Sequence, residues 1–225
     1  KTEHLKKLQE KYDLKDSLSN LKKLIYDCKK YGTKPFAILA RHGFIAISFL
    51  RSFEKLQILS KKDISKFLMT IKTISSDFIR DIENFSPKNK SNFLKKYGHL
   101  RPGTYDILSE KYSDSFEFRK KKTIKKIYNG KFVLSKKKKS KLDRYFKNLK
   151  IHLSANEMLD YCEKAIIARE YSKFIFTKSL SHILDKIITF GDQNNITKND
   201  LSFLTIDDIL SKSLNLQRLE KIIKK

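Results

Sequence analysis

Glycine and proline are scarce in this chain, and their scarcity constrains its fold more than any other feature of the sequence. Six glycines and three prolines are spread over 225 residues. Sandwiches, barrels and propellers need many tight turns, and tight turns depend on these two residues. The chain can still bury a sizeable core, because 40% of its residues are apolar and they include 16 Phe and 10 Tyr. We therefore predict an all-α protein.

Capping chemistry divides the chain into helices. In a capping box, a Ser or Thr oxygen accepts a hydrogen bond from an amide that the helix leaves unpaired, and an acidic side chain three residues later returns the bond. Four segments fit this pattern: Ser60–Asp63, Ser154–Glu157, Thr197–Asp200 and Thr205–Asp208. Ser86-Pro87 places proline at a first helical position, where its missing N–H costs nothing.

The predicted fold is an irregular helical domain with a loop-rich middle. We expect helices at residues 3–12, 16–31, 34–57, 61–84, 87–96, 140–148, 155–190, 198–203 and 206–224. Residues 98–117 have the composition of a loop. Residues 128–134, around Asn129-Gly130, form either a small hairpin or only a turn.

The net charge of +25 comes mainly from lysine, since only 8 of the 50 basic residues are arginine. Proteins that read bases rely on the planar fork of arginine, so a lysine bias indicates a solvated surface or nonspecific attraction to phosphate. The densest run, residues 119–141, holds 12 basic residues and no acidic one. We interpret it as a solvated loop or insert, with binding of a polyanion as the alternative.

The remaining composition indicates a cytoplasmic protein. Cys28 and Cys162 lie far apart and have no metal-ligand spacing, so we expect two reduced thiols. No apolar run reaches the roughly 18 to 20 residues that a membrane span requires, and we expect no membrane partner. The chain starts at Lys1 and ends in a charged stretch, which suggests a single domain, residues 1–225, taken from a larger protein.

Two long helices carry polar residues in unexpected places. Helix 34–57 is apolar almost all round, so we expect it to be central and buried, with Arg41 and His42 paired to an acidic side chain or to a ligand. In helix 155–190, Arg169 and Lys173 share one face, with Glu170 one step round. These three residues either line a cavity or include an ordinary surface pair between Glu170 and Lys173.

The loop at residues 96–106 differs in character from the rest of the chain. It gathers aromatic, basic and acidic side chains around a Pro102-Gly103 turn, in which we expect Gly103 to adopt a positive φ. The polar and aromatic side chains of this loop are Tyr97, His99, Arg101, Tyr105 and Asp106. Such a loop either holds side chains in fixed directions for a site or is a purely structural turn.

The segment Phe93 to Asp106, FLKKYGHLRPGTYD, resembles a segment of enzymes related to phosphoenolpyruvate synthase and pyruvate phosphate dikinase, rifampicin phosphotransferase included. The pattern in that family is roughly F-L-x-x-Y-G-H-x-x-P-G-x-Y-D. A second block, residues 168–181 followed by 201–210, resembles the later part of the same region in members associated with bacterial surface polysaccharides. The resemblance covers most of residues 20–215.

This resemblance implies a helical acceptor-binding domain. The family combines an ATP-grasp domain, a mobile domain whose histidine carries the phosphoryl group and, in many members, a separate domain for the acceptor. The chain has neither a glycine-rich nucleotide loop nor a segment typical of a phosphorylated histidine. We therefore expect no cofactor on this chain and no activity from it alone, with ATP and Mg²⁺ handled by other domains of the same polypeptide. The polysaccharide-linked members include an enzyme that phosphorylates the amide nitrogen of L-glutamine, so the resemblance suggests a small-molecule acceptor of this kind.

Phosphoryl transfer needs in-line positioning and neutralisation of charge on the phosphoryl oxygens. Arg101, Arg169 and Lys173 are the residues expected to grip an acceptor carboxylate or the incoming phosphoryl group. Arg41 and Tyr105 complete the expected set of substrate-binding residues.

Carboxylates and histidines supply the remaining expected roles. Asp106 or Glu170 would hold an α-ammonium group, and His99 or His42 would accept the proton that the nucleophile loses. The alternative from another class is a noncatalytic basic module that binds nucleic acid or another polyanion through residues 119–141. We expect nucleic acid to be the less favoured partner, because no known nucleic-acid-binding motif is present.

Overall fold

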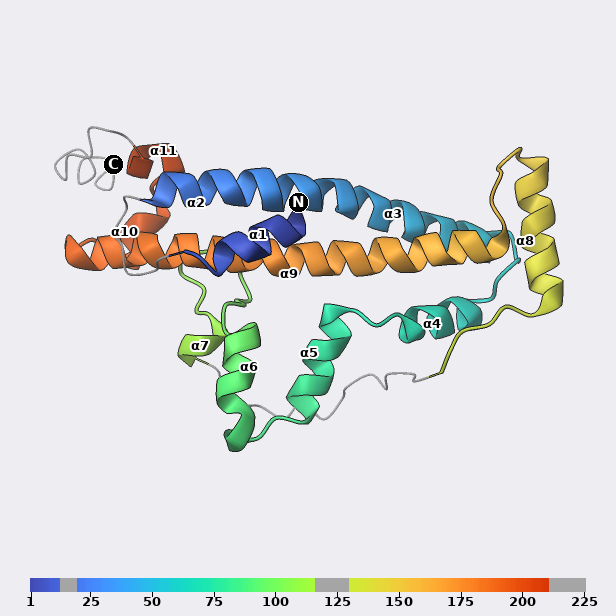
Figure 1. Ribbon diagram of the computed structural model, residues 1–225, viewed down its shortest axis with the longest axis horizontal. Coiled ribbons are helices and arrows are strands. Elements are labelled where there is room, and N and C mark those ends of the chain that lie inside the picture. Colours follow the sequence, from blue (N-terminus) through green and yellow to red (C-terminus); the bar gives the residue numbers. More distant parts are fainter. Residues whose placement is uncertain (13–19, 116–129, 211–225) are drawn as a thin grey trace. The chain divides into compact units, whose positions relative to one another are not determined.

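The computed structural model of the chain describes residues 1–12, 20–115 and 130–210 (Figure 1). Every regular element in these residues is a helix, and none of them lies in a strand, so the all-α prediction is confirmed. The residues group into two compact units that alternate along the sequence. Unit 1 comprises Lys1–Pro35, Phe85–Arg119 and Phe174–Lys225, and unit 2 comprises Phe36–Asn84 and Lys120–Lys173.

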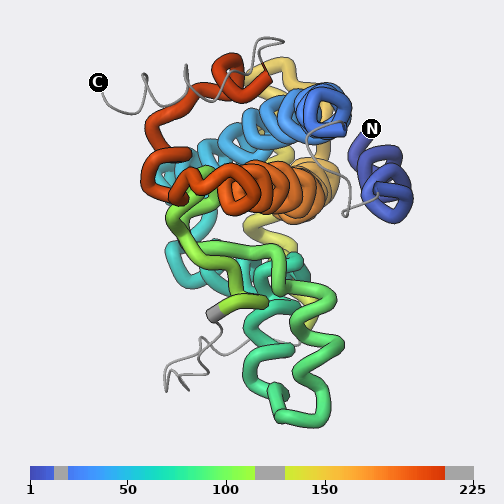
Figure 2. Tube along the Cα trace, turned by 90° about the vertical axis from the view of Figure 1, so that its left-hand side faces the viewer, coloured from blue at the N-terminus to red at the C-terminus, as the bar shows by residue number. Residues whose placement is uncertain are grey.

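Unit 1 is built around the second half of the long helix α9. Helices α2 and α6 lie on opposite sides of this half of α9, as Figures 1 and 2 show. The other elements of the unit are short: α1 (Thr2–Gln9), α2 (Leu21–Asp27), a π-helical turn (Cys28–Thr33), a 3-10 turn (Pro87–Asn89), α6 (Lys90–Tyr97), α7 (Tyr112–Ser115), α10 (Lys198–Ser202) and α11 (Ile206–Leu210). Apolar residues from α1, α2 and α9 are buried in this unit, among them Leu5, Leu24 and Phe176.

Unit 2 contains the first half of α9 and the helices α3 (Lys34–Lys55), α4 (Lys61–Thr70), α5 (Ile74–Glu83) and α8 (Lys136–Asn148). Its core is a single cluster of apolar side chains: Ala46, Leu50, Phe53, Ile58, Leu59, Phe67, Ile71, Leu142, Phe146, Ala155, Met158, Cys162 and Ala165. The Phe53 and Phe146 rings meet edge to face, with their centroids 5.8 Å apart.

Helix α9 runs from Ala155 to Gln193, a length of 39 residues. Its residues up to Lys173 belong to unit 2, and those from Phe174 onward belong to unit 1. The long predicted helix at 155–190 is therefore confirmed, with an end three residues later than expected. In unit 2 this helix contributes to the apolar core, whereas in unit 1 it buries several polar side chains.

The predicted capping boxes are confirmed. The Ser60 and Thr197 boxes are complete, and Ser154 and Thr205 exchange the same pairs of hydrogen bonds with Glu157 and Asp208. The helix expected at 61–84 is broken in two, because Thr73 caps a new helix through Ser76. The cap is Thr-x-x-Ser, which lacks the acidic residue of the usual pattern.

The loop-rich middle differs from the prediction at both of its ends. A short helix, α7, follows the loop, and α8 begins at Lys136, four residues earlier than expected, because Ser135 caps it. Part of the lysine-rich run is thus helical and not a loop. Residues 130–134 contain no strand, whereas residues 119–129, the expected helix start at 16–19 and the end at 211–224 lie outside the described residues.

Helix α3 is not buried all round as its composition suggested. Gly43, Ala46 and Phe53 face the core of unit 2, whereas Arg41 and His42 are exposed. The prediction of a buried charge in need of a partner is wrong here, because a helix packed on one side leaves the other to solvent.

The continuous helical segment Leu21–Lys55 is long and apolar enough to cross a membrane, with a mean hydropathy of 1.3 in its best window. The expectation that no segment reaches this length is therefore wrong. Core helices of soluble proteins pass the same test, so the segment by itself carries no argument for a membrane.

Candidate functional site

The loop after α6 is fastened to α9 by the buried side chain of Arg101. Its Nη2 donates to Asp185 Oδ1 at 3.1 Å and to Ser181 Oγ at 3.2 Å, and its Nη1 donates to the Ser109 carbonyl at 3.2 Å. Only 4% of the Arg101 side chain is exposed, whereas Asp185 is about one third exposed. The fork of Arg101, expected to grip a substrate, is therefore occupied by groups of the protein itself.

Asp185 holds a second cation of the same loop. Lys111 Nζ donates to Asp185 Oδ2 at 2.8 Å and lies 3.9 Å from Asp114 Oδ1. One carboxylate thus receives both Arg101 and Lys111, one on each oxygen. A charge-assisted network of this kind fixes the loop against the helix more firmly than neutral bonds would.

His99 is half-buried in the same loop. Its ring meets the Phe174 ring edge to face, with the centroids 4.9 Å apart. Burial first, and then the nearby Lys178 ammonium group and His182, lower the pKa of His99 to about 3. The imidazole is therefore neutral at physiological pH.

The tautomer of His99 follows from its hydrogen bonds. The ring bonds to the backbone carbonyl of Phe174, while Nε2 is buried without a partner among the described residues. A carbonyl only accepts, so Nδ1 carries the proton and Nε2 keeps its lone pair. The structure thus presents a buried, unprotonated nitrogen in the loop that the sequence singled out.

A second half-buried histidine, His182, lies on α9 one turn after Lys178. Burial first, and then Lys178, lower the pKa of His182 to about 4, with smaller contributions from Lys111 and Lys186 against the raising effect of Asp185. Its Nδ1 is also buried without a partner among the described residues. Lys178 itself makes no ion pair with any described residue. We name this set the loop cluster: His99, Arg101, Ser109, Lys111, Lys178, Ser181, His182 and Asp185.

Tyr97, at the start of the loop, is fully buried, whereas the loop exposes two of its other predicted site residues. Tyr105 is exposed, and Asp106 Oδ1 accepts the backbone N–H of Leu108 at 2.9 Å. The prediction of a positive φ at Gly103 is wrong. Glycine is needed there for space, because a Cβ would approach the Asp106 Cβ to 2.9 Å and the Ser109 Cβ to 3.1 Å.

Unit 2 contains the second group of predicted site residues. Arg169 lies over the Phe44 ring at 5.4 Å, and its Nη1 is 3.7 Å from Glu170 Oε1. Glu170 in turn accepts a hydrogen bond from Ser75 Oγ at 3.0 Å. Arg169 and Glu170 are therefore brought together, and the Nε of Arg169 is buried without a partner among the described residues.

The other predicted residues of unit 2 are exposed. His42 Nδ1 lies 3.0 Å from Tyr161 Oη, on the surface, whereas Arg41 and Lys173 make no hydrogen bond or ion pair with a described residue. No contact joins Lys173 to Glu170, so the surface pair offered as an alternative is not formed. The roles proposed for these side chains in substrate binding stay predictions.

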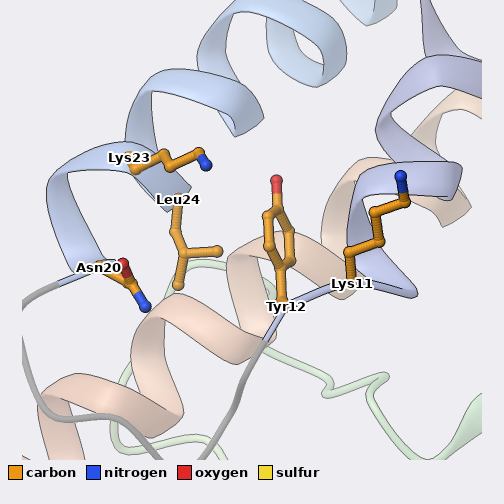
Figure 3. Close-up of a pocket in the computed structure, with 5 residues that line it drawn as sticks. All are labelled: Lys11, Tyr12, Asn20, Lys23 and Leu24. Carbon is orange, nitrogen blue, oxygen red and sulfur yellow. The ribbon is translucent and has the colours of Figure 1, made fainter.

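A small pocket opens between the end of α1 and the start of α2 in unit 1. It has a volume of about 140 Å³ and is lined by Lys11, Tyr12, Asn20, Lys23 and Leu24. Figure 3 shows Tyr12 standing between Lys11 on one side and Lys23 and Leu24 on the other. The Tyr12 hydroxyl donates to the buried Asp27 at 3.1 Å, and burial followed by this carboxylate raises its pKa. None of the predicted site residues lines this pocket.

The described residues contain no group of three or more His, Cys, Asp or Glu side chains arranged to hold a metal ion. Comparison with known proteins does not extend these observations, since no family model, curated protein or solved structure matches the chain.

The sequence missed the α9 half of the loop cluster. Lys178, Ser181, His182 and Asp185 were not singled out, although Phe174, Lys178, His182 and Asp185 recur at the spacing that places residues on one helical face. Polar residues at that spacing, continuing along the same helix beyond Lys173, were the available signal.

Proposed function

We propose that this chain is the acceptor-binding part of a dikinase-type phosphotransferase. In this proposal it positions a small acceptor, L-glutamine being the first choice, to receive a phosphoryl group from a phosphohistidine domain of the same polypeptide. ATP and Mg²⁺ act in an ATP-grasp domain elsewhere in that polypeptide. The protein would act in the cytoplasm, where ATP is available.

The proposal rests on the sequence and the contacts of the loop from Tyr97 to Asp106. Its sequence resembles that of the phosphotransferases, and a buried guanidinium fixes it against α9. The same loop offers an unprotonated His99 nitrogen near Lys178, which forms no ion pair with a described residue. A neutral imidazole near positive charge suits a transfer of this kind, because the arriving anionic group offsets the cations and raises the pKa of the imidazole, which can then take the proton that leaves the acceptor.

The proposed step moves one phosphoryl group and one proton. The bond between phosphorus and the carrier imidazole nitrogen breaks, and that nitrogen keeps the electron pair. A new nitrogen–phosphorus bond forms on the acceptor amide, whose proton passes to a base. We assign the base to His99 rather than to His42, because His42 is exposed and its Nδ1 is engaged with Tyr161.

The contacts in the structure change the roles that the sequence suggested for the other residues. Arg101 becomes a positioning residue, since its fork is held by Asp185, Ser181 and the Ser109 carbonyl. Tyr105 and Asp106, exposed on the same loop, stay the candidates for contacting the acceptor. Arg41, Arg169, Glu170 and Lys173 belong to unit 2, and a role for them in binding the acceptor stays a separate prediction.

Calorimetric titration with L-glutamine tests the proposal. We expect saturable binding of L-glutamine, and binding of L-asparagine weaker by about tenfold because its side chain is one methylene shorter. We also expect no ATP consumption by the chain alone. Absence of L-glutamine binding would overturn the acceptor assignment, and ATP turnover by the purified chain would overturn the domain assignment.

The same preparation tests the polyanion alternative. A mobility-shift titration with nucleic acid at increasing salt reports binding through released counterions. Tight, steeply salt-dependent binding that is lost when residues 119–141 are deleted, in a chain that ignores L-glutamine, would favour the basic module instead.

A further inference from the structure

Buried nitrogens without partners are concentrated in the loop cluster. Among the described residues four buried side-chain nitrogens lack a hydrogen-bond partner, and three of them are His99 Nε2, Arg101 Nε and His182 Nδ1. Leaving one such group unpaired costs about 1–3 kcal/mol, so native structures rarely leave them so without a water, an ion or a ligand. Three in one place indicate a common missing partner.

The α9 residues of this neighbourhood share a single face of the helix. Phe174, Lys178, His182 and Asp185 are spaced i, i+4, i+8 and i+11, which places them along one side of a helix. His99 contacts the first of these residues and Arg101 binds the last. Lys178 and His182 therefore lie along the stretch of helix that the loop follows from His99 to Arg101.

Charge indicates what the partner is. Three cationic side chains belong to this neighbourhood, and they are Arg101, Lys111 and Lys178. Two carboxylates oppose them, Asp185 and the more exposed Asp114. Lys178 has no described acidic partner, and it acts on both histidines. A surplus of positive charge beside hydrogen-bonding nitrogens favours an anion.

We propose that Lys178, His99, His182 and the Nε–H of Arg101 bind one oxyanion, of the kind that a phosphoryl group or a carboxylate presents. Lys178 supplies the charge and Arg101 donates a hydrogen bond, and each imidazole donates to the anion once it has taken up a proton. The side chain of Lys178 is half-buried. The inference deepens the proposed function and rests on it only for naming the anion as the transferred phosphoryl group.

Binding of the anion is coupled to protons. In its absence both histidines are neutral, because burial and Lys178 oppose their charging, with Lys111 and Lys186 adding to the effect on His182 and Asp185 opposing it. A bound anion offsets these cations and raises the pKa of both imidazoles. Binding therefore takes up protons, and affinity increases as the pH falls from about 7 toward 5.

Inorganic phosphate is the probe. The chain is titrated with phosphate at constant ionic strength while the histidine side-chain resonances are followed by NMR, and acetate is titrated in a parallel sample. We expect the His99 and His182 resonances to move together and to saturate, with His152 unaffected. Calorimetry in two buffers of different ionisation enthalpy checks the proton uptake. Binding of phosphate alone identifies a phosphoryl site, and binding of both anions identifies a general oxyanion site.

Two lysine variants give the matched comparison. Lys178→Gln should weaken phosphate binding by about tenfold to a hundredfold, the usual loss for a hydrogen bond to a charged group. Lys164→Gln, on the same helix but exposed and paired with Asp160, should leave it unchanged. Histidine resonances of the wild-type chain that ignore phosphate would overturn the site, as would equal affinity in both variants. Binding of phosphate without binding of L-glutamine would support the oxyanion site and reject L-glutamine as the acceptor. Binding of L-glutamine without binding of phosphate would support the acceptor and reject the oxyanion site.

Discussion

The two halves of α9 bury different chemistry. The half in unit 2 contributes Ala155, Met158 and Cys162 to a core of apolar side chains. Unit 1, by contrast, holds seven of the eight buried polar or charged residues of the described chain: Gln9, Asp27, Arg101, Thr177, Ser179, Ser181 and Lys186. It also holds three of the four buried nitrogens without partners.

The two units therefore differ in what their interiors contain. Apolar packing explains the core of unit 2, because burial of apolar surface stabilises the fold. Buried polar groups add little net stability, and unpaired ones reduce it. A region that keeps such groups is better explained by what it binds than by what it stabilises.

The largest effect should follow from removing a large apolar side chain in unit 2. We expect Phe53→Ala to lower the free energy of unfolding by about 3–5 kcal/mol, because it leaves a cavity beside Phe146. Phe44→Ala, on the exposed side of the same helix, should cost less than about 1 kcal/mol. Urea denaturation measures both, and equal losses would contradict the placement of the core.

The next largest effect should follow from removing the carboxylate of the loop cluster. Asp185→Asn leaves Arg101 and Lys111 without their counter-charge, and we expect a loss of about 2–3 kcal/mol, less than for a fully buried pair because Asp185 is partly exposed. The control is Asp114→Asn, which removes a more exposed carboxylate near the same lysine and should change stability by less than about 0.5 kcal/mol. Denaturation of the two variants side by side decides the matter, and a smaller loss for Asp185→Asn would sink the proposed role.

Acid should weaken unit 1 before it weakens unit 2. His99 and His182 have folded pKa values well below those of the unfolded chain, so the unfolded state binds more protons as the pH falls below about 6.5. Stability therefore declines as the pH falls through about 6.5, by roughly 1–2 kcal/mol for each of the two histidines between pH 6.5 and 5.

Variants identify the groups responsible. His182→Gln should flatten this part of the pH dependence of unfolding, whereas His152→Gln, an exposed histidine, should leave it as it is. Burial raises the pKa of Asp63, but the hydrogen bonds from Lys138 and Ser60 outweigh it and lower the pKa to about 2. Asp63 therefore loses its contribution to stability only at lower pH, as the pH falls from about 4 toward 2. The same decline in wild type and His182→Gln would rule out this histidine as its source.

The smallest effect is expected on α8. Lys138 Nζ lies 2.6 Å from Asp63 Oδ2, and because the lysine is partly exposed we expect Lys138→Gln to cost at most about 1 kcal/mol. Lys137→Gln removes an exposed neighbouring charge and should be neutral within about 0.5 kcal/mol. Thermal unfolding of the two variants compares them, and a larger loss for Lys137→Gln would show that the run has a structural role beyond the one pair.

The sequence predicted the helices well where local chemistry decides them. The capping boxes at Ser60 and Thr197 depend on residues three apart, so they can be read without the fold. The break at Thr73 was missed because its partner is Ser76, whose hydroxyl replaces the usual carboxylate. Burial of α3 was misjudged because an apolar helix looks the same whether it is covered on one side or on all sides.

The loop half of the candidate site could also be predicted, because its residues lie close together in the sequence. His99 and Arg101 belong to one short loop with an unusual composition, so the sequence brings them to attention together. Lys178 and Asp185 are about 80 residues away, and only the fold places them against that loop. The pairing of Arg101 with Asp185, which makes the arginine a positioning residue, could not be predicted from either segment alone.

Hydrogen exchange with and without L-glutamine and phosphate tests most directly whether the polar half of α9 is the site. We predict slower exchange in residues 97–111 and 174–186 when both ligands are present, with the α8 and α9 segments of the unit 2 core unchanged. Slower exchange confined to unit 2, around Arg169 and Glu170, would contradict this account and move the site there. No change anywhere would reject the acceptor and the oxyanion site together.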